Sequence, residues 1–194
     1  MPVRFPSFVE ELPLTRRALE FAAELHEQRR READRAPFIL HPLEVGQLLY
    51  GRGYPDHVVA AGVLHEVIEE GAAERDELAD LFGEHVASLV CVVTEPEQGD
   101  WQERKRRLRD AVAASSEEAA IVFAADKVAK ARETRVLLAT GRADDPSRPS
   151  SADRLTHYWA SLEVLEEALG EHPFVRQLRF ELEALELLPP IAVS

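Results

Sequence analysis

The feature that most constrains the fold is an apolar run over residues 58–68, VVAAGVLHEVI, which carries ionisable groups near its end and is followed by Glu69 and Glu70. The run leaves no clean polar stripe, so a helix over it should be buried on nearly all sides. On that helix His65 lies one turn from Glu69, and Glu66 one turn from Glu70. Buried carboxylates need a metal ion or a cation as partner. The run therefore predicts a central helix with a functional site; the plainer alternative is an amphipathic edge with solvated glutamates and His65 as a core histidine.

Length and residue usage favour a single all-α domain. The 194 residues are enough for one full-sized core and too few to divide comfortably into two. Alanine, leucine, glutamate and arginine dominate the sequence, and all four favour helix over strand. We expect one compact bundle of about eight to ten helices over residues 1–194, with its core at about 14–169.

Charge and cysteine usage narrow the function classes. A net charge of −13 argues against a nucleic-acid partner, because a polyanionic backbone would be repelled. The single cysteine, Cys91, excludes an intrachain disulfide and favours a reducing compartment. The apolar stretches are too short to cross a bilayer, and the acidic N-terminal segment does not resemble a signal peptide. We therefore expect a cytoplasmic protein with no membrane partner, and the oligomeric state stays open.

Helical periodicity and end signals predict the course of the chain. Thr15 and Asp56 are expected to cap the first and the central helix, and Ser115 with Glu118 suggests a capping box before the long helix. A loop rich in proline and serine is expected over 141–151. The expected helices cover residues 14–25, 42–51, 56–71, 78–82, 86–93, 101–107, 119–138, 154–170 and 173–187.

Four residues that are distant in sequence make a candidate metal site. His41 follows the rigid segment APFIL and precedes Pro42, so its imidazole should be held in place. Asp126 interrupts an apolar helix surface, which is costly without a ligand role. Together with His65 and Glu66 they offer two imidazoles and two carboxylates, a set that suits Mn²⁺ or Fe²⁺ and permits Zn²⁺. Such an ion activates water and orients a phosphoryl oxygen.

The ordered motifs QRRR (28–31), PFILHP (37–42), LHEVIEE (64–70), VT (93–94), ERK (103–105) and ADK (125–127) resemble the HD-domain phosphohydrolases. They are most similar to the hydrolase domain of the RelA/SpoT-type enzymes and its free-standing versions, the small alarmone hydrolases of the metazoan SpoT homologue type. The resemblance covers about residues 14–169. It implies an all-helical enzyme that uses manganese to remove the 3′-diphosphate from a guanosine alarmone, a small-molecule nucleotide.

The resemblance also implies roles for individual residues. The metal ligands would be His41, His65, Glu66 and Asp126. Glu69 and Glu70 would be the catalytic acid pair around the attacking water. Cations are suited to phosphates and an aromatic ring to the nucleoside. The implied substrate-binding residues are Arg30, Arg31, Lys105, Lys130, Arg154 and Tyr158.

Three positions depart from the family pattern. Glu66 stands where the family has aspartate, Gly71 where it has threonine, and Lys130 where it has asparagine. Because of these changes, two other functions are kept beside alarmone hydrolysis: a phosphatase of another nucleotide such as NADPH, and a nucleotide-binding HD protein with impaired catalysis. Among the remaining residues, His57, His85 and His172 are expected at the surface or in caps, and Arg109 in solvent.

Overall fold

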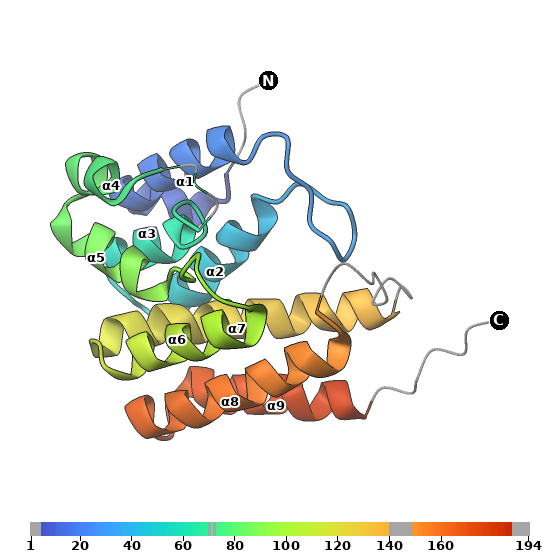
Figure 1. The fold of residues 1–194 in the computed structure, drawn as a ribbon. Helices are drawn as coiled ribbons and strands as arrows, with labels where there is room; N and C mark the ends of the chain where they lie inside the picture. The colour runs from blue at the N-terminus through green and yellow to red at the C-terminus, as the bar shows by residue number, and fades with distance from the viewer. Residues whose placement is uncertain (1–4, 70, 72, 140–148, 188–194) are drawn as a thin grey trace.

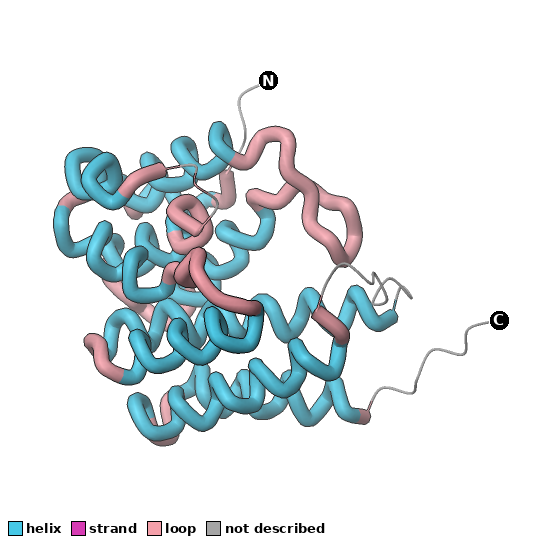
Figure 2. The backbone as a smooth tube through the Cα atoms, in the orientation of Figure 1, coloured by secondary structure: helices cyan, strands magenta, loops and turns pink. Residues whose placement is uncertain are grey.

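The computed structural model describes residues 5–69, 71, 73–139 and 149–187, and the regular secondary structure of this part of the chain is helical, joined by loops (Figure 2). The expected all-α fold with eight to ten helices is thereby confirmed. The only β pairing within the described ranges is an isolated bridge between Arg30 and Pro37. The elements are a 3-10 helix η1 (Ser7–Glu11) and the helices α1 (Pro13–Leu25), α2 (Leu40–Tyr50), α3 (Asp56–Leu64), α4 (Arg75–Phe82), α5 (Glu84–Val93), α6 (Trp101–Ala113), α7 (Glu117–Ala139), α8 (Ser151–Leu169) and α9 (Pro173–Glu186).

The long helix α7 forms the middle of the molecule (Figure 1). It packs against α2, α3 and α5 on one side and against α8 and α9 on the other, and α6 also lies along it. Its residues from Ala119 to Ala125 are almost completely buried, because helices cover it on both sides. An ionisable group on this stretch is therefore held inside the core.

The hairpin of α2 and α3 brings the start of one helix beside the end of the other. Two glycines let these helices approach closely. A Cβ added at Gly62 would lie 2.3 Å from Cδ1 of Leu49, and one at Gly46 would lie 2.9 Å from Cγ2 of Val63. Since His41 is near the beginning of α2 and His65 directly follows α3, this close packing places the two imidazoles together.

The predicted caps of the first and central helices were wrong. Thr15 is fully buried inside α1, whereas Asp56 makes no cap hydrogen bond on α3. Instead the Asp56 carboxylate accepts hydrogen bonds from the backbone N–H groups of Leu14 (2.9 Å) and Thr15 (2.8 Å), and from the Thr15 hydroxyl (2.7 Å). Asp56 thus caps α1 from across the interface, a pairing that no local signal reveals.

The central helix is shorter than predicted. α3 ends at Leu64, and residues 65–69 form successive turns. The ring of His65 contributes to this ending, because its Nδ1 lies 2.7 Å from the Gly62 carbonyl oxygen, one of the acceptors left open at a helix C-terminus. Gly71 has a φ of 62°, a conformation that glycine adopts without strain. Because of these turns, Glu66 and Glu69 do not lie where they would on a continuous helix.

The expected capping box at Ser115 was also wrong. Ser116 accepts from the backbone N–H of Ala119, while Ser115 donates to the Val112 carbonyl, and α7 starts at Glu117. Most of the predicted 141–151 loop lies outside the described residues. No described helix combines the length and the apolar character that a membrane crossing requires.

Candidate metal centre and adjoining cavities

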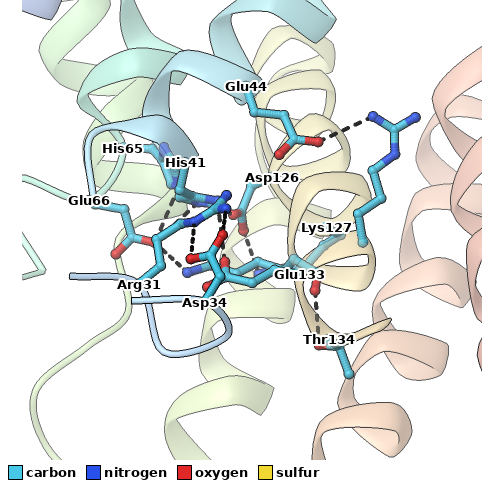
Figure 3. A network of polar contacts seen from close by, with 12 residues as sticks. Arg31, Asp34, His41, Glu44, His65, Glu66, Asp126, Lys127, Glu133 and Thr134 are labelled. Atoms are coloured by element: carbon cyan, nitrogen blue, oxygen red, sulfur yellow. Dashed lines mark hydrogen bonds and ion pairs between the residues drawn. The ribbon is translucent and has the colours of Figure 1, made fainter. Parts of the chain in front are cut away.

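The four predicted ligands converge on one point in the core (Figure 3). His41 comes from the first turn of α2, His65 and Glu66 from the turns after α3, and Asp126 from the middle of α7. The two Nε2 atoms of the histidines lie 3.2 Å apart. Oδ1 of Asp126 is 3.2 Å from Nε2 of His41 and 3.3 Å from Nε2 of His65, and Oε1 of Glu66 is 3.6 Å and 3.4 Å from the same atoms.

The surroundings of the rings fix which nitrogen faces the cluster. Because Nδ1 of His65 donates to the Gly62 carbonyl, Nε2 is the nitrogen that faces the cluster. His41 directs Nδ1 toward Glu133, whose Oε2 is 4.0 Å away, and it also presents Nε2. Orientation of an imidazole through its second nitrogen is a recurring feature of metal-binding histidines.

The donor set fits a divalent cation better than a hydrogen-bond network. Oδ1 of Asp126 is buried and has no hydrogen-bond partner among the described residues, although two ring nitrogens lie within 3.3 Å of it. Two ligand atoms at about 2.0–2.1 Å from a tetrahedral ion lie roughly 3.3 Å apart, which matches these separations. The set of two imidazoles and two carboxylates contains no thiolate and suits a borderline or hard divalent ion.

The two carboxylates of the cluster stay ionised, and each of them pairs with a lysine, Glu66 with Lys130 and Asp126 with Lys127. Burial lowers the pKa of His41 to about 4. Burial also opposes protonation of His65, but Asp126 and Glu66 outweigh it and raise the pKa of that imidazole to about 10. Despite burial, Lys130 and His65 hold the pKa of Glu66 well below its usual value. The two ionised carboxylates thus attract positive charge, as a metal centre requires.

Two cavities, of about 490 Å³ and 300 Å³, adjoin the cluster. They share five lining residues: Glu32, Glu69, Lys130, Arg154 and Tyr158. The smaller cavity reaches Glu66 of the cluster, and the larger contains most of the basic groups. The additional cations are Arg104, Lys105 and Lys127 in the larger cavity and Arg29 and Arg30 in the smaller one. Carboxylates line the same cavities, so the walls combine both charges, and the cations are the groups that could contact an anion.

Five of the six predicted substrate-binding residues line these cavities: Arg30, Lys105, Lys130, Arg154 and Tyr158. Several of them are paired in this conformation. Lys105 contacts Glu95, Arg154 donates to both oxygens of Glu32 at 3.1 and 3.2 Å, and Nζ of Lys130 lies 3.0 Å from Oε1 of Glu66.

The structure does not bring the sixth residue, Arg31, to either cavity. Arg31 pairs with Asp34 and lines a separate depression. Its neighbour Arg29 lines the smaller cavity instead, with its guanidinium 4.2 Å from the centre of the Phe38 ring. Both arginines belong to the same basic cluster in the sequence. The path of the loop before α2 decides which of them lines the cavity.

Of the predicted acid pair, Glu69 and Glu70, the structure describes only Glu69. Glu69 lines both cavities, and burial together with the negative charge of Glu66 raises the pKa of its carboxyl. A carboxyl with a raised pKa beside a metal cluster is suited to exchange a proton during catalysis. Glu70 lies outside the described residues.

Lys127 and His157 also line the larger cavity, although the sequence analysis gave neither of them a role. Nζ of Lys127 lies 2.7 Å from Oδ2 of Asp126, on the side away from the histidines, and Lys127 follows that ligand directly in the sequence. His157 is buried in the wall of the larger cavity, and burial lowers its pKa to about 2. Arg109, which was expected in solvent, donates to Nδ1 of His157 at 2.8 Å. The hydrogen of this neutral ring is therefore on Nε2, a buried atom that has no partner in the described part of the chain.

Comparisons with known proteins agree with this geometry. The model of the HD domain family matches residues 18–144. MESH1 of Drosophila melanogaster, named a guanosine-3′,5′-bis(diphosphate) 3′-pyrophosphohydrolase, is 33% identical over 126 residues, which are 63% of this chain and 70% of that protein. A probable enzyme of the same name from Synechocystis is 44% identical over 78 residues, or 40% of this chain, but the match spans only 10% of that protein.

A solved structure gives the same result. It is described as a metazoan ortholog of SpoT that hydrolyzes ppGpp, and it superimposes with a TM-score of 0.76 and 25% identity over 96% of this chain and 100% of its own. The family model covers well over half of this chain, and the chain covers more than two thirds of the Drosophila relative. The resemblance inferred from the motifs is confirmed: this chain belongs to the HD domain family, in the group that includes the MESH1 proteins.

Proposed function

We propose that this protein is a metal-dependent 3′-pyrophosphohydrolase of guanosine-3′,5′-bis(diphosphate). The observation that carries the proposal is the convergence of His41, His65, Glu66 and Asp126 beside two cavities lined by cations. The names of the relatives support the same reaction. The reaction adds water across the bond to the 3′-diphosphate and yields pyrophosphate and guanosine 5′-diphosphate.

The four cluster residues would hold the metal, for which Mn²⁺ is our proposal. A bound divalent cation supplies Lewis-acid activation of water and of a phosphoryl oxygen. Lys105, Lys130 and Arg154 bind the two diphosphate groups of the substrate, because cations at the cavity wall offset their charge. Tyr158 lines both cavities and offers a flat apolar surface to the nucleoside.

In this scheme Glu69 accepts a proton from, or donates one to, the reacting groups around the attacking water. Its carboxylate lies in both cavities, and its raised pKa brings it closer to neutral pH than an ordinary glutamate. His157 adds a neutral ring to the wall of the larger cavity, and its Nε2–H is buried without an acceptor among the described residues. Glu70 keeps the predicted role of second acid.

The test is pyrophosphate release from guanosine-3′,5′-bis(diphosphate), measured with and without Mn²⁺ after treatment with a chelator. We expect turnover only with the metal. Asp126→Asn should abolish both turnover and metal binding, because the variant keeps the shape of the side chain and loses its charge. Glu163→Gln is the matched control, since Glu163 is exposed on α8, away from the cluster. An intact substrate after long incubation with metal-loaded protein would refute the proposal.

A second candidate is a phosphatase of another nucleotide that carries a 2′ or 3′ phosphate, such as NADPH. The observation in its favour is Lys130, a departure from the pattern of the resembled family, which lines both cavities. An added cation can pair with a phosphate in a different position. Parallel assays of several nucleotides distinguish the two: a higher kcat/KM for NADPH would favour the second.

The catalytically impaired alternative rests on Glu66, but its carboxylate reaches the histidines despite the extra methylene, at 3.4 Å from Nε2 of His65. This position supports a working site. The metal content of the wild type and of Glu66→Asp tests this alternative. If the wild type holds no metal and Glu66→Asp does, the protein is catalytically impaired. A cytoplasmic location and a single domain over the whole chain complete the proposal.

A further inference from the structure

A second group of metal-ligating side chains lies apart from the buried cluster. It consists of His57, His85 and Glu118, each of them the second residue of its helix, in α3, α5 and α7 respectively. His57 precedes His65 by eight residues, and Glu118 precedes Asp126 by eight, so the group lies roughly 12 Å along both helices from the buried ligands. The two sites are therefore separate.

The carboxylate of Glu118 lies between the two imidazoles. Oε1 of Glu118 is 3.1 Å from Nε2 of His57, and Oε2 of Glu118 is 2.6 Å from Nε2 of His85. The two imidazole rings lie 5.0 Å apart with an angle of 52° between their planes. One carboxylate thus joins two histidines from different helices, and both rings present the same nitrogen.

The group is open to solvent on one side. The side chains of His57 and Glu118 are each 35% exposed, and that of His85 is 60% exposed. An ion can therefore enter from water, and a water molecule can complete its coordination. The three ligand atoms lie within 4.8 Å of one another, a separation that a single ion can bridge.

Nearby charges favour an ionised carboxylate at the centre. Burial alone would raise the pKa of Glu118, but its hydrogen bonds with His57 and His85 lower it below its usual value. The positive ends of three helix dipoles meet here and oppose a cation. The acidic first residues of the same helices, which include Glu84 and Glu117, reduce this effect.

We propose that His57, His85 and Glu118 form a second divalent-metal site, of the zinc class, on the surface. Two histidines and one glutamate with an open fourth position are a recurring zinc donor set. The ion would join the first turns of α3, α5 and α7. Of these helices, α7 carries the buried ligand Asp126, and α3 leads directly into the turns that carry His65 and Glu66. It would therefore stabilise the scaffold that holds those ligands.

The experiment counts zinc ions per chain. The full protein is stripped with a chelator and dialysed against Zn²⁺, and bound zinc is measured by elemental analysis. We expect two ions per chain in the wild type, one in His85→Ala and one in Glu118→Gln. Glu117→Gln, which alters the neighbouring exposed carboxylate, should keep two. Circular dichroism checks the fold of each variant.

Separate variants distinguish the two sites. His65→Ala removes a buried ligand and should leave one zinc ion, while His65→Ala combined with His85→Ala should leave none. An equal zinc count in the wild type and in folded His85→Ala would overturn the proposal, as would a metal-free His65→Ala protein. Neither result bears on the hydrolase proposal, which is tested by substrate turnover.

Discussion

Lys130 should set the affinity of the buried site for its metal. Its ammonium group lies 3.0 Å from Oε1 of Glu66, and despite burial the negative charges of Glu66 and Asp126 raise its pKa, so it is charged at neutral pH. In the metal-free protein, Lys130 is the lysine that neutralises Glu66. A bound cation would compete with this lysine for the same carboxylate and would be repelled by its charge.

The size of the effect follows from the ion pair. Removal of one partner from a buried pair costs about 3–5 kcal/mol. Since the Lys130 side chain is 29% exposed, water screens part of this, and we expect about 2–3 kcal/mol for Lys130→Met. The metal regains that free energy when it becomes the partner of Glu66. Mn²⁺ should therefore bind roughly 30- to 150-fold more tightly to the variant.

The assay is calorimetric titration of Mn²⁺ into stripped wild-type and Lys130→Met protein, with thermal unfolding of both forms. The variant should unfold at a lower temperature without metal and recover more of its stability when metal is added. Arg135→Gln removes a cation from the same helix that pairs with Glu181 instead, and it should leave Mn²⁺ affinity unchanged. Unchanged or weaker Mn²⁺ binding by Lys130→Met would refute the argument.

Three further predictions concern the scaffold and the pH dependence. Gly62→Ala places a Cβ 2.3 Å from Leu49 and should lower the free energy of unfolding in urea by about 1–3 kcal/mol. Gly51→Ala meets only backbone carbonyls of the preceding helix, the nearer at 3.1 Å, and should cost less. Equal losses in the two variants would contradict the packing argument. Asp56→Ala removes the cap of α1 and should lower the free energy of unfolding by about 0.5–2 kcal/mol, and a wild-type urea midpoint would count against that cap. If ionised Glu69 accepts a proton, kcat/KM should fall as the pH drops through a pKa above 4.5, and Glu69→Gln should remove this limb of the pH profile while Mn²⁺ binding persists.

The pattern of apolar residues was enough to predict the helical fold, because helix periodicity is a local property. The ends of the helices were harder to predict from the sequence. The sequence placed the end of the central helix at Gly71, yet it ends at Leu64, where the His65 ring takes up a backbone carbonyl. The cap of α1 comes from Asp56, about forty residues away, so no short sequence window contains it.

The ligand types of the metal centre were determined by the sequence alone, since an imidazole or a carboxylate in an apolar surface is costly without a partner. Their convergence depends on tertiary packing: the close approach of α2 and α3 at Gly62, and the central position of α7, bring His41, His65 and Asp126 within hydrogen-bonding distances. Only the folded chain also decides that Arg29 rather than Arg31 faces the cavity, because side-chain direction in an irregular loop follows the path of the backbone and not the identity of the residue.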